Sequence, residues 1–380
     1  MAMKQLPFDE KLNIGYLSRL FDDTSNCYKF FWFQAILGKL TEEKTGFTFG
    51  ELINEMIADA WYMVTEYHLR LGPFGVTDNL EEAVKYIGQI KGFPSSERRE
   101  RIIAFLENSD DRQLLRYKKE LIKNVPYRIQ SPFLDEVKVD KREWNKPEEL
   151  TRKINQQKRL LYYYDSFMQL DTAIVLNEDW VGYLLRNREI LKGWMQLNLI
   201  HYLQRRNPSV PGIADKLSAP QSRDIDRVRR YWKLIIDFRP DIREIYGHKD
   251  MAGESISVDH FVPWQYVAHD ELWNLHPTTK SINSSKSNGL PEWDLYFEPL
   301  YRLEYLSYTL SKENEKIAEA FDKVSKYHLN NEEIARTLYC TGLTEGDFGE
   351  RLSNVIRPIY NAAKNSGFKE WRYEEAACLK

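Results

Sequence analysis

The sequence predicts an α+β protein that is predominantly helical. Apolar residues recur at three- and four-residue steps over long stretches of the 380 residues, whereas runs rich in β-branched and aromatic residues are few and short. A composition of 42% hydrophobic and 13% aromatic residues is sufficient for a sizeable core, and this length favours two or three domains over one.

We expect the first part of the chain, residues 1–125, to form a helical domain. From Thr48 to Gly72 the apolar residues follow an amphipathic helical pattern. Thr48 and Glu51 form a capping-box pair at its start, and Gly72-Pro73 is a typical stop. Similar helical patterns cover residues 13–40, 79–91 and 97–123.

Residues 126–210 are predicted to be a mixed α/β linking or interaction region. The runs LLYYYDSF (160–167) and TAIVLN (172–177) predict a short hairpin or small sheet, and helical spacing returns over 178–206. Residues 207–221 contain three prolines and a glycine, which indicates a connector and the main domain boundary.

Beyond the connector we expect a domain over residues 211–325 and a helical C-terminal extension over 326–380. The first element is a helix over 224–238, which Arg239-Pro240 ends. Helical patterns return over 303–327 and 331–363.

Charge and composition exclude several classes of protein. The 54 Lys and Arg against 57 Asp and Glu leave a net charge of −3, so an anion-binding surface has to be local. Cys27, Cys340 and Cys378 lie far apart without a C-x-x-C, which argues against a disulfide framework and a zinc knuckle. The N-terminus lacks an apolar signal region, and no apolar run of membrane-spanning length follows. We therefore expect a cytoplasmic protein without a membrane span.

Between residues 257 and 291 the chain reads SVDHFVPWQYVAHDELWNLHPTTKSINSSKSNGLP. Asp259 and His260 are predicted on opposite faces of a strand that stops at Pro263. Asn274 follows His260 by fourteen residues. Asn283 follows Asn274 by nine residues, and Lys286 follows Asn283 by three. Both are predicted on a short helix that begins near Thr278 or Thr279. Asn283 and Lys286 would then share a helical face.

These residue types match the needs of phosphodiester hydrolysis. The reaction needs a base to deprotonate water and a divalent cation to stabilise the phosphorus centre and the leaving oxygen. His260 is the natural base near neutral pH. Asp259 and Asn283 supply hard oxygen ligands, which favour Mg²⁺ or Mn²⁺ over zinc.

The pattern D-H-F-V-P-W, then N-L, then N-x-x-K-S-N-x-L-P resembles the HNH nuclease motif, the ββα-metal (His-Me) finger. The asparagine at 283, where many members have histidine, is similar to the HNH domain of the RNA-guided CRISPR effector nuclease. The resemblance implies such a finger embedded in the helical C-terminal domain. It implies His260 as general base, Asp259 and Asn283 as metal ligands, and Asn274 as the residue of the catalytic centre that orients His260 through backbone contacts. Asp270 matches an acidic position of that variant.

The same resemblance implies a metal-dependent endonuclease acting on nucleic acid, with double-stranded DNA as the favoured substrate. Lys286, Arg227 and Arg230 are the expected contacts to phosphates. The chain has no P-loop. Its long helical flanks predict a partner, such as an ATPase or regulatory protein, or a second copy of the chain. Prokaryotic restriction and phage-defence nucleases resemble this arrangement.

Several alternatives remain open. The finger could be a catalytically inactive scaffold or interaction module, or it could belong to an RNA-directed nuclease. Asn283 could be a turn former and Lys286 a solvated lysine. Arg227 and Arg230 share their helix with acidic residues and could belong to a solvated face. His248, His269 and His276 lie outside the motif positions and are expected on the surface or around the site.

Overall fold

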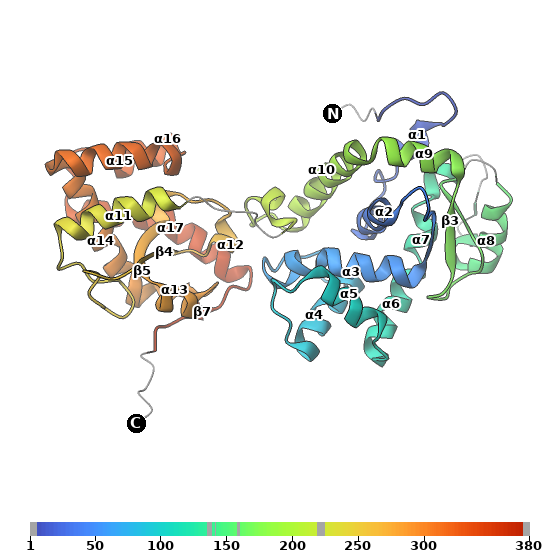
Figure 1. Ribbon diagram of the computed structural model, residues 1–380, viewed down its shortest axis with the longest axis horizontal. Helices are drawn as coiled ribbons and strands as arrows, with labels where there is room; N and C mark the ends of the chain where they lie inside the picture. The colour runs from blue at the N-terminus through green and yellow to red at the C-terminus, as the bar shows by residue number, and fades with distance from the viewer. Residues whose placement is uncertain (1–5, 135–138, 141, 158–159, 219–224, 375–380) are drawn as a thin grey trace. The chain divides into compact units, whose positions relative to one another are not determined.

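A computed structural model describes residues 6–134, 139–140, 142–157, 160–218 and 225–374. The chain packs into two compact units (Figure 1). One comprises the described residues up to Pro208 together with Leu217 and Ser218, and the other comprises Ser209–Lys216 and the described residues from Ile225 onward. The change of unit falls in the predicted connector, of which residues 219–224 lie outside the described part.

The first unit is helical around the long helix α3 (Phe49–Thr65), which packs against α2, α4, α5 and α6. Its other helices are α1 (Ile14–Ser18), α2 (Tyr28–Lys39), α4 (Asn79–Lys91), α5 (Arg99–Glu107), α6 (Arg112–Ile122), α7 (Val125–Arg128), α8 (Pro147–Asn155), α9 (Glu178–Arg186) and α10 (Arg188–Arg206), with 3₁₀ turns η1 (Ser131–Leu134) and η2 (Glu143–Asn145). The predicted helical character of this region is confirmed.

Three of the predicted helices are interrupted, and a fourth ends early. The stretches 13–40, 97–123 and 178–206 each form two helices. In the second of these, the Asp111 carboxylate caps the N-terminus of α6 by accepting a hydrogen bond from Leu114 N (2.8 Å), which starts a new helix. The helix begun at Thr48 ends at Thr65 and not at Gly72. His68 adopts a left-handed conformation (φ 53°), and Leu69 N donates to Met63 O (3.0 Å), which closes the helix.

The predicted hairpin is confirmed as part of a three-stranded antiparallel sheet of order β1-β3-β2. Strand β2 (Tyr162–Tyr164) pairs with β3 (Ala173–Leu176), and β1 (Gly46–Thr48) pairs with the other edge of β3. The sequence analysis missed β1 because its three residues lead directly into the helical pattern that begins at Thr48. The sheet joins the core through Trp32, whose indole N–H donates to the Tyr162 hydroxyl (3.1 Å).

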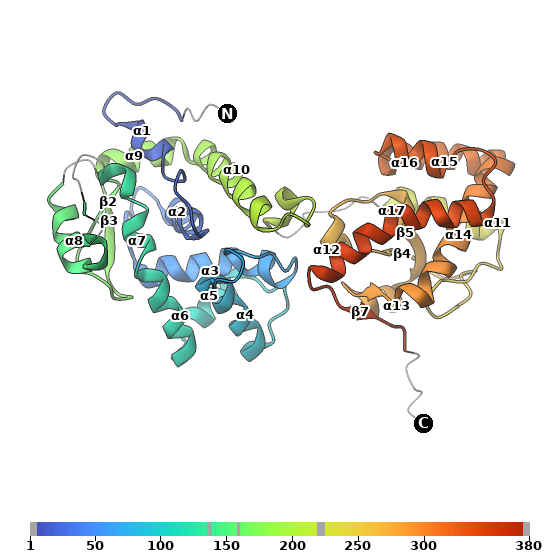
Figure 2. The same ribbon diagram turned by 180° about the vertical axis from the view of Figure 1, so that it is seen from behind.

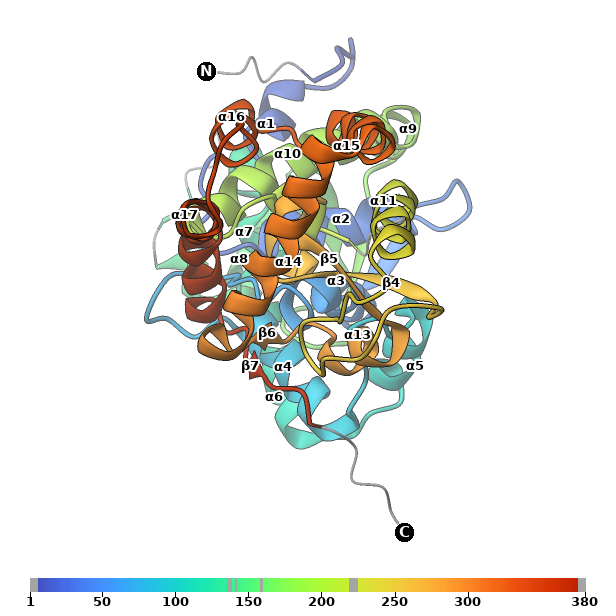
Figure 3. The ribbon, with the colours of Figure 1, turned by 90° about the vertical axis from the view of Figure 1, so that its left-hand side faces the viewer.

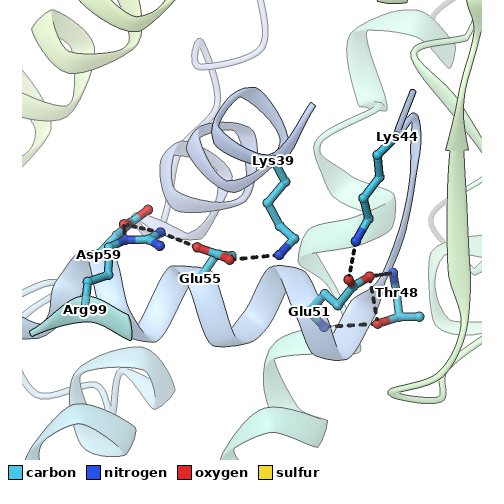
Figure 4. Close-up of polar contacts among 7 residues, drawn as sticks. All are labelled: Lys39, Lys44, Thr48, Glu51, Glu55, Asp59 and Arg99. Carbon is cyan, nitrogen blue, oxygen red and sulfur yellow. Dashed lines mark hydrogen bonds and ion pairs between the residues drawn. The ribbon is translucent and has the colours of Figure 1, made fainter. Parts of the chain in front are cut away.

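Polar contacts fix the start of α3 (Figure 4). Glu51 N donates to Thr48 Oγ1 (3.1 Å), and Thr48 N donates to Glu51 Oε2 (2.8 Å), which confirms the predicted capping box. One turn further along, Arg99 from α5 pairs with both Glu55 and Asp59. Lys39 from α2 also pairs with Glu55 (3.0 Å), so cations from two neighbouring helices balance these two carboxylates.

The second unit combines helices with two small sheets. Its helices are α11 (Asp226–Phe238), α12 (Trp264–Val267), α13 (Lys280–Lys286), α14 (Trp293–Glu313), α15 (Glu315–His328), α16 (Glu332–Leu338) and α17 (Glu345–Asn365), with η3 (Ile213–Lys216) and η4 (Leu272–Asn274). Its strands are β4 (Ile256–His260), β5 (Leu275–Thr279), β6 (Leu290–Pro291) and β7 (Glu370–Trp371). The α+β, mostly helical fold class is therefore confirmed.

In this unit β4 and β5 form an antiparallel pair, against which α11 and α13 pack. Helix α14 packs against α15 and α17 (Figure 2). The predicted helix over 303–327 is wrong at Asn314, which ends α14 and accepts hydrogen bonds at the N-terminus of α15. The predicted helix over 331–363 is likewise divided, into α16 and α17. None of the helices in the described residues is long and apolar enough to cross a membrane.

Candidate active site

Two strands and one helix bring the residues of segment 257–291 together. Strand β4 pairs with β5 so that Asp259 lies opposite His276 and His260 opposite Leu275. Thr279 then caps α13 by accepting a hydrogen bond from Ile282 N (3.4 Å). The expected helix start near Thr278 or Thr279 is confirmed, and α13 carries Asn283 back towards β4.

Asn274 braces the chain just after His260. Its side chain is fully buried, accepts a hydrogen bond from Val262 N (2.8 Å) and donates one to Val262 O (2.9 Å). Its backbone carbonyl accepts from Phe261 N (2.9 Å). Asn274 therefore clamps the two residues that follow His260. Its burial makes it a positioning residue that is out of reach of a substrate.

Asp259, His260, Asn283 and Lys286 line one polar pocket of about 220 Å³. Strand β4 ends at His260, whereas the sequence predicted an extended stretch to Pro263. Asp259 and His260 are 4% and 5% exposed, and both line this opening. The pocket has the size to admit a phosphate group with a few waters.

His260 is held by a carboxylate. Its Nε2 lies 2.8 Å from Asp270 Oδ1. The tautomer that suits this pair places the proton on Nε2, which leaves the lone pair on Nδ1. The loop that carries Asp270 is fixed in turn, because His328 Nδ1 contacts Asp270 O (2.7 Å) and the Glu271 carboxylate accepts from Asn330 N (3.1 Å).

Asp259 lies in a cluster of buried polar side chains. The Lys286 ammonium is 3.1 Å from each carboxylate oxygen and donates to His260 O (2.7 Å). The Tyr246 hydroxyl donates to Oδ2 (2.7 Å), and His276 Nε2 is 3.5 Å from the same oxygen. Burial, opposed by Asp259, lowers the pKa of Lys286. Burial and the Asp259 carboxylate raise the pKa of Tyr246 well above its usual range, so its hydroxyl keeps the proton that it donates.

His276 completes the cluster as a neutral side chain. It is fully buried, and burial lowers its pKa to about 4 despite the opposing effect of Asp259. Its Nε2 also lies 3.1 Å from the Tyr246 hydroxyl. With a neutral imidazole here, Lys286 is the positive charge that balances Asp259.

Two side-chain oxygens in the pocket retain lone pairs that suit a hard divalent cation. Asn283 Nδ2 donates to Ser257 Oγ (2.8 Å) and Val258 O (3.1 Å), which fixes the amide and keeps its Oδ1 as the acceptor. A carboxylate offers about four lone-pair positions, and Lys286 occupies one of those on Asp259 Oδ1. Asp259 Oδ1 and Asn283 Oδ1 are thus two protein ligands available to a cation. Mg²⁺ accepts such a set, because it retains several waters.

In the described part of the chain, no group of three or more His, Cys, Asp and Glu side chains is placed to hold a metal ion. The donor set of one carboxylate and one amide is the chemistry that the sequence indicated for Asp259 and Asn283.

Of the other predicted phosphate contacts, Lys286 is in the pocket, but its ammonium contacts Asp259 and His260 O and its side chain is 0% exposed. The alternative prediction that Lys286 is a solvated lysine is therefore wrong. Arg227 and Arg230 lie on α11 and line a different cavity.

The sequence did not identify Tyr246 as a residue of the site, and it predicted His276 only on the surface or around the site. Tyr246 follows Glu244, whose carboxylate accepts from Tyr246 N (2.8 Å) and Gly247 N and so forms a tight turn. An acidic residue two positions before Tyr-Gly was the available signal for a turn, but the contact with Asp259 depends on the tertiary fold.

A model of the HNH endonuclease family matches residues 244–292. The match begins at the Tyr246 turn and includes β4, β5 and α13, with Asp259, His260, Asn283 and Lys286 of the pocket. The curated proteins and the solved structures contain no match to the chain.

Proposed function

We propose that the HNH endonuclease domain at residues 244–292 makes this protein a metal-dependent endonuclease that hydrolyses phosphodiester bonds of nucleic acid. One observation carries the proposal. Asp259, His260 and Asn283 line the same small polar pocket on a frame of two strands and a helix. A base and two hard oxygen ligands around one opening are the groups that this hydrolysis needs.

In this mechanism His260 accepts a proton from the attacking water. Asp270 orients the imidazole, favours the tautomer with the proton on Nε2 and stabilises the positive charge that forms on the ring. Asp259 and Asn283 would hold Mg²⁺ or Mn²⁺, which would polarise the scissile phosphate and stabilise the leaving oxygen. Lys286 and Tyr246 hold the Asp259 carboxylate in place.

Double-stranded DNA is the substrate that we favour, and the amide at 283 is the feature that links the chain to the asparagine-type HNH domain of the RNA-guided nuclease. The helical unit before Pro208 is larger than hydrolysis requires. We propose that it receives a partner, such as an ATPase, a regulatory protein or a second copy, in a prokaryotic restriction or phage-defence setting.

The test is cleavage of supercoiled plasmid by the full chain with Mg²⁺. Wild-type protein and the exposed-histidine control His248→Ala should nick or linearise the plasmid, whereas EDTA, His260→Ala and Asn283→Ala should reduce the rate by about 10²–10⁴-fold. Undiminished cleavage by His260→Ala would refute the assignment of the base.

Two alternatives are resolved by the same assay. Absence of cleavage by wild-type protein with Mg²⁺, Mn²⁺ or any other divalent ion would favour the inactive scaffold. Replacing the plasmid with structured RNA separates a DNA-directed from an RNA-directed nuclease.

A further inference from the structure

Helices α11 and α15 pack side by side in the second unit (Figure 3). Side chains of these two helices line a second cavity, called the groove below. The cavity has a volume of about 520 Å³. Its lining includes four cationic side chains, namely Arg227, Arg230, Lys323 and Lys326, and among the described residues no acidic one. In a chain with a net charge of −3, this concentration of positive charge is local and specific.

Among the described residues, Arg230 and Lys326 form no ion pair. Asp226, on α11, pairs with Arg229, which does not line the cavity. Glu319 lies 3.8 Å from Lys323, but both side chains are largely exposed, so water and salt screen that pair. The groove therefore keeps a positive potential suited to an anion.

An aromatic ring lies at the same place. The Arg227 guanidinium lies 4.1 Å from the centre of the Tyr327 ring, and Tyr327 is 58% exposed. A large exposed aromatic residue beside several cations is typical of surfaces that follow a nucleic-acid strand, where cations contact phosphates and rings contact bases or sugars.

The groove adjoins the candidate active site through the first turn of α11. Ile225, the N-cap residue of α11, lines the pocket with Asp259 and His260, and Arg227, two residues later, lines the groove. Residues two positions apart on a helix point to opposite sides of it, so the two cavities lie on either side of this first turn, about one helix diameter (about 10 Å) apart. The phosphates of each strand of a duplex are spaced about 3.4 Å apart along the helix axis, so a strand with one phosphate at His260 would have others near the groove.

We propose that the groove between α11 and α15 binds backbone phosphates of the nucleic-acid strand that is cut, next to the scissile phosphate. The identity of the ligand rests on the proposed nuclease function. The groove anchors the strand, and the pocket at His260 performs the hydrolysis.

The test measures binding of a fluorescent DNA duplex to the full chain in EDTA, at a series of salt concentrations, by fluorescence anisotropy. The groove variant combines Arg230→Gln, Lys323→Gln and Lys326→Gln. The control variant removes the same charge from positions on the same two helices that do not line the cavity, with Arg229→Gln, Lys233→Gln and Lys316→Gln.

The groove variant should bind more weakly, because fewer DNA phosphates are neutralised by the protein. The slope of log affinity against log salt should fall by about 0.9 for each phosphate that the variant no longer neutralises, thus by about 2–3. The control variant should bind like wild type. Equally weakened binding by both variants, or unchanged binding by the groove variant, would overturn the proposal.

Competition with inorganic phosphate distinguishes a strand-binding groove from a small-anion site. Inorganic phosphate that competes at the same concentration as duplex phosphates would show a small-anion site and overturn the strand assignment, whereas competition only at far higher concentrations supports it. Because binding is measured without metal, a wild-type protein that binds through the groove but never cleaves would disprove the nuclease function and leave the groove assignment intact.

Discussion

At the scale of single residues, His260 and Asp270 determine whether the pocket contains a base. The imidazole is 5% exposed and its Nε2 contacts a carboxylate at 2.8 Å. This contact orients the ring and selects the tautomer, as a carboxylate does in the Ser-His-Asp triad. Asp270 is thus a positioning residue with an electrostatic role, and the sequence alone had left its role open.

We expect Asp270→Asn to lower kcat by roughly tenfold or more, with a much smaller change in KM. The amide keeps a hydrogen bond to Nε2 but loses the charge that stabilises protonated His260. Steady-state cleavage of a labelled duplex measures both constants, with Asp294→Asn on the exposed side of α14 as control. A variant with wild-type kcat would show that Asp270 is only structural.

Lys286 is the second residue on which the pocket depends, because it is the buried cation that balances Asp259. Removing one partner of a buried pair leaves the other charge uncompensated. We expect Lys286→Ala to lower the free energy of unfolding by roughly 3–5 kcal/mol.

Urea unfolding of the full chain measures this change. Lys280→Ala, an exposed position on the same helix, should change the free energy by no more than about 0.5 kcal/mol. Equal, small effects of both substitutions would mean that the contact between Lys286 and Asp259 does not contribute to stability.

At the scale of elements, the sequence predicted what local chemistry determines and missed what distant contacts determine. The capping box at Thr48 and the start of α13 were predictable because the capping side chain lies within three residues of its partner. The early end of α3 was not predictable, because it depends on the backbone conformation of one residue, His68. The pairing of β1 with β3 was not predictable either, because the two strands are remote in sequence.

The candidate site divides in the same way. Asp259, His260, Asn274 and Asn283 were found because their spacing is a pattern within one segment. The contact of Tyr246 with Asp259 was not found, because it joins a turn to a strand through the fold and leaves no spacing in the sequence.

The N-terminus of α4 gives a prediction at this scale. Asp78 caps the helix by accepting from Leu80 N (3.1 Å) and Glu81 N (3.0 Å), and burial raises its pKa to about 6. A pKa above the unfolded value of 3.8 means that ionised Asp78 costs stability at neutral pH, and that this cost disappears as the pH falls from above 6 to below 4.

Asp78→Asn keeps a good cap without the charge. At pH 7 it should raise the free energy of unfolding, by up to about 3 kcal/mol from the pKa difference, and this advantage should vanish near pH 4. Urea unfolding at pH 7, 5.5 and 4 measures the trend. An advantage that stays constant with pH would rule out titration of Asp78 as its cause.

At the scale of the whole molecule, the chain consists of two compact units with separate cores. The pocket, the groove and every residue of the matched family region belong to the second unit. The described residues that line the candidate active site therefore come from the second unit.

A chain that begins at Ser209 should therefore fold by itself. In urea it should unfold in one cooperative transition, with an m-value below that of the full chain because it exposes less surface. Circular dichroism at increasing urea concentration measures this. A broad transition without cooperativity would show that the second unit needs the first for its stability.

The central claim is that His260 is the base that activates water, and chemical rescue tests it most directly. In His260→Gly the ring is replaced by a cavity that free imidazole can enter. With Mg²⁺ and a labelled duplex, the variant should cleave about 10²–10⁴-fold more slowly than wild type, and added imidazole should restore part of the rate, whereas Asn283→Ala should not respond. Cleavage by His260→Gly at the wild-type rate without imidazole would contradict the account.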